Sequence, residues 1–442
     1  MSSATLMASL AVLISLVFAT LASGAAGVRV ELTRIHSGPG VTASQFVRDA
    51  LRRDMLRHDA RRLAASDDGM VSAPTRKNSL GGVGEYLMTL AIGTPPVSYP
   101  AIADTGSDLI WTQCAPCSDH QCFKQPTPLY NPASSTTFGV LPCGSPLSMC
   151  AVAPAPAGCS CPYNSYNYTY GTGWTAGVQG SETFTFGSSR ADQTRVRGIA
   201  FGCSNASSDN FKGSSGLVGL GRGAVSLVSQ LDAGRFSYCL TPFQDTSSTS
   251  TLLLGSSASL DGITGVGSTP FVASPATALD TFYYLNLKGI SLGTMALSIP
   301  PDAFSLNADG SGGLIIDSGT TITMLVDAAY RQVRAAILSL VTLPTKDGSE
   351  SELDLCFALP SPTSAPPDMP SMTLHFDGAD MVLPPDSYMI TYTENSLWCL
   401  MMGSRRDGEM STLGNYQQQN MHILYDVGQE TLSFAPTKCS ML

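Results

Sequence analysis

One short pattern occurs twice in this chain, and it constrains the fold more than any other feature. Residues 101–107 read AIADTGS and residues 314–320 read LIIDSGT, so an apolar run ends in Asp104 in one copy and in Asp317 in the other. A segment that ends in glycine follows each copy, 115 residues after Asp104 at Gly219 and 97 residues after Asp317 at Gly414. A single Asp-Thr-Gly triplet is common in ordinary turns, whereas two copies with matching surroundings indicate an internal duplication.

The residues beside each aspartate suit a junction at which two loops meet. Gly106 and Gly319 lack side chains, which leaves room for the loops to approach each other and for a substrate backbone to pass. We expect the hydroxyls of Thr105 and Ser318 to hydrogen-bond across the junction and to fix the geometry of the two loops.

Two aspartates at one junction predict acid–base chemistry. We expect Ser107 and Thr320 to donate hydrogen bonds to the outer carboxylate oxygens, which favours ionisation. Two adjacent carboxylates do not both ionise easily, so Asp104 and Asp317 are expected to share a proton and to titrate as a unit. The ionised form would take a proton from a water, and the protonated form would hydrogen-bond a carbonyl. This chemistry needs no metal, cofactor or covalent intermediate.

The remaining patterns predict a mostly β protein. Residues 86–92 alternate in hydrophobicity and end at Gly-Thr-Pro-Pro, which is typical of a strand and a turn. Other strand-like runs are Phe282–Leu287, Leu314–Asp317, Met372–Phe376 and His422–Tyr425. The clearest helix in the body is Val326 to Val341, where apolar residues lie on one stripe.

Charge divides the chain into a basic leader and an acidic body. The chain has 43% apolar and only 13% charged residues, which excludes disorder as its main state. Its net charge of -10 argues against a nucleic-acid partner. Residues 25–80 carry 10 Lys or Arg and 6 Asp or Glu, whereas the residues from 81 onward carry 14 and 28.

The first 24 residues are predicted to be a signal peptide. Leu10 to Phe18 is apolar and small residues follow it, as in a secretory leader, although the usual Lys or Arg before the apolar run is missing. The alternative is a buried N-terminal helix. The apolar run is too short to cross a bilayer, and we expect no membrane anchor.

The twelve cysteines and two sequons fit a secreted protein. Cys114, Cys117, His120 and Cys122 have a spacing that resembles part of a zinc site, but such sites usually pair two short motifs across a longer loop. Disulfides are therefore expected in place of a metal. Asn167 and Asn205 begin Asn-x-Thr and Asn-x-Ser sequons and are candidate glycosylation sites.

The leader contains a basic segment with helical periodicity between Val41 and Ala65. One interpretation is a solvated amphipathic helix, and a basic helix also suits a membrane surface. Because the segment precedes an acidic body, we favour an intramolecular partner. Its positive charges would pair with carboxylates at neutral pH and release them when acid protonates those groups.

From about Gly84 to Cys439 the chain resembles the pepsin-like aspartic proteases, and among them the plant nepenthesin-type group. Trp111 stands where the family keeps a tryptophan bonded to the tyrosine of a flap. Residues 168–173 resemble that flap, with Tyr170 and Gly171 over the substrate; the alternative for Trp111 and Tyr170 is a core role. The Gly-Thr-Gly-Trp of this flap departs from the group, which tends to have an acidic residue after the first glycine and Ser after the second.

The resemblance also implies a set of disulfides, which sequence alone cannot establish. The implied pairs are Cys114–Cys117, Cys122–Cys203, Cys143–Cys161, Cys150–Cys159, Cys239–Cys439 and Cys356–Cys399.

The resemblance implies a bilobal pepsin-like fold with the active site between two related β lobes. Its parts would be a signal peptide (1–24), a basic propeptide (25–80), an N-terminal lobe (81–257) and a C-terminal lobe (258–442). The expected function is a secreted, monomeric aspartic endopeptidase that is made as a zymogen, cuts polypeptides at acidic pH and is inhibited by its own propeptide. The apoplast is the expected location, with the vacuole or plastid as alternatives. The alternative function is a catalytically weak pepsin-fold protein that binds or inhibits another enzyme.

Overall fold

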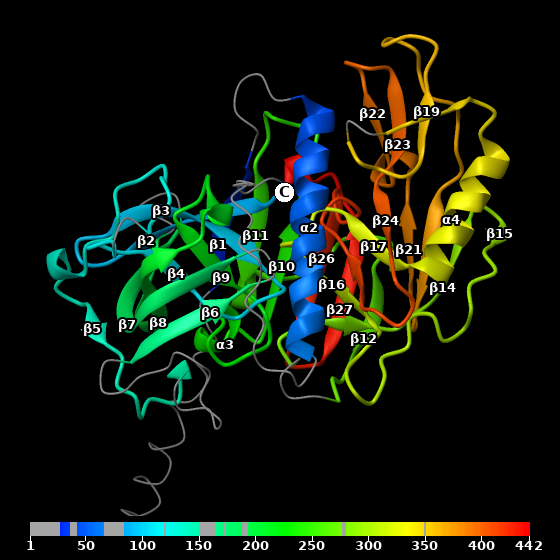
Figure 1. Cartoon of the computed structure of the whole chain (residues 1–442). Coiled ribbons are helices and arrows are strands. Elements are labelled where there is room, and N and C mark those ends of the chain that lie inside the picture. The colour runs from blue at the N-terminus through cyan, green and yellow to red at the C-terminus, as the bar shows by residue number, and fades with distance from the viewer. Residues whose placement is uncertain are drawn as a thin grey trace, which may run out of the picture.

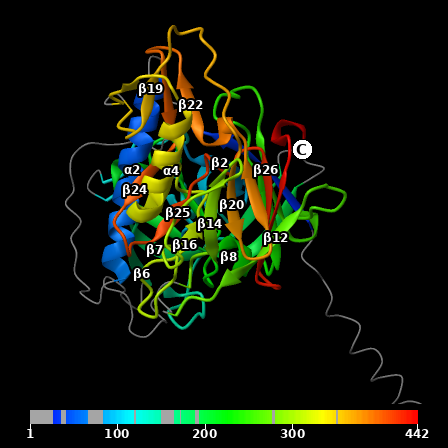
Figure 2. The same cartoon turned by 90° about the vertical axis from the view of Figure 1, so that its right-hand side faces the viewer.

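Two β-rich lobes stand on either side of one long helix in the computed structural model of the chain (Figure 1). The structure describes residues 27–35, 42–65, 84–118, 121–149, 164–170, 173–187, 193–275, 280–348 and 351–442, without the side chains of residues 59–65. In the view turned by 90°, the long helix α2 runs along one side of the molecule, and the C-terminus lies on the other (Figure 2).

The described elements are mostly strands, in agreement with the predicted fold class. The helices are α2 (Ala43–Ala65), α3 (Leu227–Gln230) and α4 (Asp327–Leu340). The strands up to the middle of the chain are β1 (Val28–Arg34), β2 (Tyr86–Ile92), β3 (Val97–Asp104), β4 (Trp111–Gln113), β5 (Gly139–Val140), β6 (Ser165–Thr169), β7 (Trp174–Phe186), β8 (Thr194–Ser207), β9 (Gly216–Gly219), β10 (Arg235–Cys239) and β11 (Ser250–Leu254). The later strands are β12 (Gly267–Val272), β13 (Tyr284–Leu285), β14 (Leu287–Leu292), β15 (Met295–Ala296), β16 (Leu314–Ile316), β17 (Thr323–Val326), β18 (Thr345–Lys346), β19 (Cys356–Ala358), β20 (Met372–Phe376), β21 (Asp380–Leu383), β22 (Met389–Tyr392), β23 (Leu397–Leu400), β24 (Met402–Arg405), β25 (Ser411–Leu413), β26 (Met421–Asp426) and β27 (Thr431–Pro436).

The duplication in the sequence is a duplication in the sheet. In the first copy, β3 lies parallel to β9, so that Asp104 is opposite Gly219. In the second copy, β16 lies parallel to β25, with Ile316 opposite Leu413, and Asp317 and Gly414 follow directly. Each glycine-ending segment therefore lies beside the strand that carries the aspartate. Strands β10 and β26 pair in antiparallel fashion and join the two halves of the chain.

Helix α4 shows why the periodic pattern in the sequence was a reliable signal. The predicted helix over 326–341 forms as Asp327–Leu340, and its buried stripe includes Tyr330, Val333 and Ile337. These residues are three or four positions apart, so they face one side of the helix and pack into the core.

The leader contributes a strand as well as the expected helix. Strand β1 pairs with β11 on one side, where Val30 is opposite Leu252, and with β2 on the other, where Leu32 is opposite Met88. Alternate residues of β1 are buried, which is the pattern of a strand with one face on a core. This strand was not predicted from the sequence.

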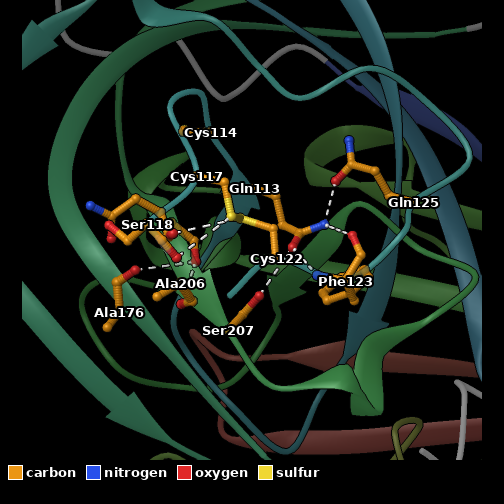
Figure 3. Close-up of a disulfide and its surroundings, with 12 residues drawn as sticks. Gln113, Cys114, Cys117, Ser118, Cys122, Phe123, Gln125, Ala176, Ala206 and Ser207 are labelled. Atoms are coloured by element: carbon orange, nitrogen blue, oxygen red, sulfur yellow. Dashed lines mark hydrogen bonds between the residues drawn. A yellow bond between two sulfur atoms is a disulfide. The ribbon is translucent and has the colours of Figure 1, made fainter. Parts of the chain in front are cut away.

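Two of the implied disulfides are wrong, and the strand pairing explains why. The structure joins Cys114 to Cys203, and it joins Cys117 to Cys122 (Figure 3), in place of Cys114–Cys117 and Cys122–Cys203. Strand β4 lies parallel to β8 with Thr112 opposite Cys203, and this brings Cys114, the residue directly after β4, to a Cα–Cα distance of 5.4 Å from Cys203. Because these cysteines are disulfide-bonded, their thiolates are not available as zinc ligands.

Of the other four implied cysteine pairs, two lie within the described residues and two do not. Cys239 is bonded to Cys439, and Cys356 is bonded to Cys399 across β19 and β23, as the resemblance implied. Cys143 is disulfide-bonded. The implied Cys143–Cys161 and Cys150–Cys159 pairs both involve residues that lie outside the described part of the chain.

Other predictions concern the surface and the ends of the chain. Asn167 is exposed on β6, and Asn205 is half-buried on β8. The predicted signal peptide lies outside the described residues. None of the described helices combines the length and apolar character needed to span a membrane.

Candidate active site

The two aspartate loops meet at one buried junction. Asp104 is the last residue of β3, Asp317 directly follows β16, and neither side chain is exposed. The backbone N–H of Ser318 donates to Thr105 Oγ1 at 2.9 Å, and the backbone N–H of Thr105 donates to Ser318 Oγ at 3.1 Å. The two loops are therefore fastened to each other by a reciprocal pair of hydrogen bonds, as expected from the two hydroxyl residues.

Each carboxylate receives the same two donors from its own loop. The N–H of Gly106 and the hydroxyl of Ser107 donate to the two oxygens of Asp104, at 3.0 and 2.5 Å. For Asp317, the donors at the corresponding positions are the N–H of Gly319 and the hydroxyl of Thr320, at 2.9 and 2.6 Å. Such donors orient a carboxylate and favour its ionised form.

Gly319 marks the close approach of the loops. A Cβ atom at this position would lie 2.2 Å from Asp104 Oδ1, which is closer than any real contact. Only glycine therefore fits between the second loop and the first carboxylate.

Helix α2 brings one arginine side chain into contact with both aspartates. Arg57 Nη2 lies 2.5 Å from Asp104 Oδ1, and Arg57 Nε lies 3.3 Å from Asp317 Oδ2. The arginine side chain is buried. Burial acts to lower the pKa of Arg57, but the attraction of Asp104 and Asp317 outweighs it and the net shift is upward, so the guanidinium stays charged.

A second group of charges fixes the same helix to the body one turn earlier. Asp54 Oδ2 accepts the N–H groups of Thr321 and Ile322, both at 2.8 Å. Arg53 donates to Asp54 and to Thr321 Oγ1, and it lies 3.3 Å from Glu85 Oε1. Burial raises the pKa of Glu85 to about 7, against the opposing attraction of Arg53 and Arg57.

The flap tyrosine predicted from the resemblance lies in an aromatic cluster. Tyr170 and Trp111 are both buried and both pack against Phe211, with ring centroids 5.4 and 5.0 Å away. Burial raises the pKa of Tyr170 well above its usual value, so its hydroxyl keeps its proton. Gly171 lies outside the described residues.

Sequence reasoning missed the residues whose role depends on tertiary placement. Arg57 was recognised only as part of a basic helix; its spacing of four from Arg53 indicates a shared helix face, but not which face meets the body. Glu85 gave no signal beyond its position before a strand. Asn415, directly after the second glycine segment, donates to the carbonyl oxygens of Gly84 and Ser318 at 3.0 and 2.9 Å.

Two family descriptions match the two halves of the chain. "Xylanase inhibitor N-terminal" matches residues 86–256, and "Xylanase inhibitor C-terminal" matches residues 282–436. Among solved structures, that of edgp superposes with a TM-score of 0.65 at 17% identity and covers 95% of this chain and 96% of its own. At that identity, the likeness establishes the fold.

Two curated relatives from Nepenthes gracilis are similar over nearly the whole chain. Aspartic proteinase nepenthesin-1 of Nepenthes gracilis is 44% identical over 416 residues, which are 93% of this chain and 90% of that protein. Aspartic proteinase nepenthesin-2 of the same plant is 42% identical, with the same coverage of both chains.

Proposed function

This chain belongs to the nepenthesin-type group of the pepsin-like aspartic proteases, and on that basis we propose that Asp104 and Asp317 are its catalytic pair. One observation carries the proposal: two buried carboxylates meet at one junction, and each is held by a glycine N–H and a hydroxyl from equivalent positions. This arrangement presents two carboxyl groups in nearly equivalent environments, which is what proton sharing requires.

In the proposed reaction, the pair holds one proton between its two carboxyl groups. The ionised group removes a proton from a water, whose oxygen attacks the carbonyl carbon of the substrate peptide. The protonated group donates to the carbonyl oxygen, and a tetrahedral intermediate forms. On its collapse the C–N bond breaks: the group that took the proton from water gives it to the leaving nitrogen, and the other group takes a proton back from a hydroxyl of the intermediate as the product carboxyl group forms. The pair then again holds one proton. Because one carboxyl group of the pair must be ionised while the other is protonated, activity is expected in acid.

The second part of the proposal is that the leader keeps the enzyme inactive. The guanidinium of Arg57 is in contact with both aspartates, so a peptide carbonyl and a water have no access to them while α2 is in place. Protonation of these carboxyl groups in acid weakens their attraction to Arg57 and favours release of the helix. The proposed protein is therefore a zymogen that becomes active when the leader is removed, and its predicted signal peptide makes it a secreted one.

Titration with pepstatin, an inhibitor that mimics the tetrahedral intermediate, tests the proposed function. The full-length precursor is brought to acidic pH, and cleavage of a denatured protein is measured against increasing pepstatin. We expect one pepstatin per chain to abolish activity, because a single pair serves each chain. Undiminished cleavage at excess pepstatin would contradict the proposal. A complete lack of cleavage would favour the alternative, a binding protein or enzyme inhibitor, which the names of the two matching families suggest.

A further inference from the structure

A chain of buried hydroxyl and amide groups runs beneath the two aspartate loops. Tyr238 on β10 and Tyr425 on β26 are fully buried, and their hydroxyl oxygens are 2.8 Å apart. In the antiparallel pairing of these strands, Ile423 is opposite Tyr238, so Tyr425 lies diagonally across from it on the same face. The pair therefore sits where the two halves of the molecule join.

One end of this chain reaches the loop of Asp317. Tyr238 Oη donates to Gln418 Oε1 at 2.5 Å. The amide nitrogen of Gln418 faces the other way and donates to the carbonyl oxygens of Leu413, at 2.8 Å, and of Asp317, at 3.4 Å. Gln418 is itself fully buried, so it spans the space between the tyrosine and the backbone of the catalytic loop.

The other end reaches the loop of Asp104. The hydroxyl of Thr105 interacts with Tyr425 and acts to lower its pKa against the effect of burial, and Thr105 Oγ1 accepts the N–H of Ser318 at 2.9 Å. Because Tyr238 donates to Gln418, the proton between the tyrosines belongs to Tyr425. The donors then point in one direction, from Tyr425 through Tyr238 to Gln418, and hydrogen bonds aligned in this way strengthen one another.

We propose that Tyr238, Tyr425 and Gln418 are positioning residues that hold the two aspartate loops in register through this single chain of hydrogen bonds. The inference rests on the proposed function, because it assigns these residues a role only if Asp104 and Asp317 carry out the reaction. Burial raises the pKa of both tyrosines, so each hydroxyl remains a donor throughout the working pH range. Removal of one hydroxyl leaves a buried partner unpaired and interrupts the chain at that point.

Hydroxyl deletions test this inference in protein that is produced at full length and then activated in acid. The variants are Tyr238→Phe, Tyr425→Phe and the double variant, with kcat expressed per pepstatin-titrated active site and KM measured for the same peptide. We expect each single variant to lower kcat about 10-fold with KM changed less than about threefold, because the loops and not the substrate contacts are disturbed. The kcat of the double variant should be no lower than that of the more impaired single variant, since each single substitution already interrupts the same series of hydrogen bonds.

Two controls separate positioning from stability and from the proposed function itself. Tyr388→Phe removes another tyrosine hydroxyl bond, from Tyr388 Oη to the carbonyl of Pro370 at 2.7 Å, and should lower Tm but leave kcat unchanged. Asp104→Asn should be inactive; if it is active, the proposed function fails.

If Asp104→Asn is inactive while both tyrosine variants keep kcat within twofold, or if their losses multiply in the double variant, the positioning role is overturned. If a tyrosine variant does not fold, Gln418→Leu breaks the same chain and is judged by the same outcomes.

Discussion

At the scale of single residues, the leader and the body meet through charges that respond to pH in opposite directions. Glu85 is buried beside Arg53, and its pKa is raised from 4.5 to about 7. Glu352 is bonded to Arg52 at the surface, and that bond lowers the pKa of Glu352. Acid therefore weakens the contact of Glu352 and relieves the cost of burying an ionised Glu85.

The raised pKa of Glu85 predicts how the stability of the precursor changes with pH. The folded precursor binds this proton more tightly than the unfolded chain does. The contribution of Glu85 to stability is therefore fully present below about pH 4.5 and is lost as the pH rises through about 7. In Glu85→Gln this loss should disappear, so Tm should fall less between pH 5 and pH 8 than in the wild type. A Glu31→Gln variant on the exposed face of β1 is the control. Equal falls in Glu85→Gln and the wild type would contradict the prediction.

The direction of the Glu85 pKa shift also indicates which carboxyl groups drive the proposed release of the leader in acid. Since protonation of Glu85 favours the folded precursor, Glu85 does not drive the release of the leader in acid. We therefore assign the release to the carboxyl groups that lose a favourable contact when protonated, namely Asp104 and Asp317 at Arg57, with a small contribution from Glu352.

At the scale of elements, helix α2 is held to the body at several points along its length. The N–H of Ser44 donates to Glu394 near the start of the helix, Asp54 binds two backbone N–H groups, and Arg57 contacts the aspartates. Apolar residues of the helix, Phe46, Val47 and Leu51, pack into the core of the second lobe. This docking explains why a segment that reads as a basic, water-soluble helix lies against the body.

The proposed role of α2 predicts the effect of removing Arg57. Arg57→Ala deletes a buried partner of two carboxylates, a loss of about 3–5 kcal/mol for a buried ion pair. The precursor should then begin to cleave peptides at a higher pH than the wild type, measured as the pH of half-maximal activation. Arg48→Ala removes an arginine of the same helix that forms an ion pair with its neighbour Asp49, and this variant should activate like the wild type. Identical activation curves for Arg57→Ala and the wild type would rule out the inhibitory role of Arg57.

Local pattern and tertiary pairing explain which elements could be predicted from the sequence. The strands at 86–92 and 372–376 and the helix at 327–340 follow from periodicity, because each buries one face of a regular element. The Cys114–Cys203 pair could not be predicted, since it depends on β4 lying parallel to β8, and 80 residues lie between these two strands in the sequence. Strand β1 was missed because its pairing partners β2 and β11 are distant in sequence.

At the scale of the whole molecule, the duplication organises both the fold and the site. Each half supplies one strand with an aspartate at its end or directly after it, and a parallel strand with a glycine at its end or directly after it. Two copies of one unit therefore form the junction. The residues of that junction were predictable because they repeat. The residues that support it are different in the two halves, and Tyr238, Gln418 and Arg57 have no repeated pattern that would reveal them.

The central claim is that Asp104 and Asp317 together hydrolyse peptide bonds, and the rate of peptide cleavage in Asp104→Asn and Asp317→Asn tests it most directly. Each variant keeps the shape of the side chain but cannot share a proton as a carboxyl pair does. After acid treatment and separation from the leader, each should lose at least about 1,000-fold in kcat/KM, because neither amide can act as the base. Asp261→Asn, an exposed aspartate away from the junction, should behave as the wild type. Cleavage at a wild-type rate by either junction variant would contradict the account.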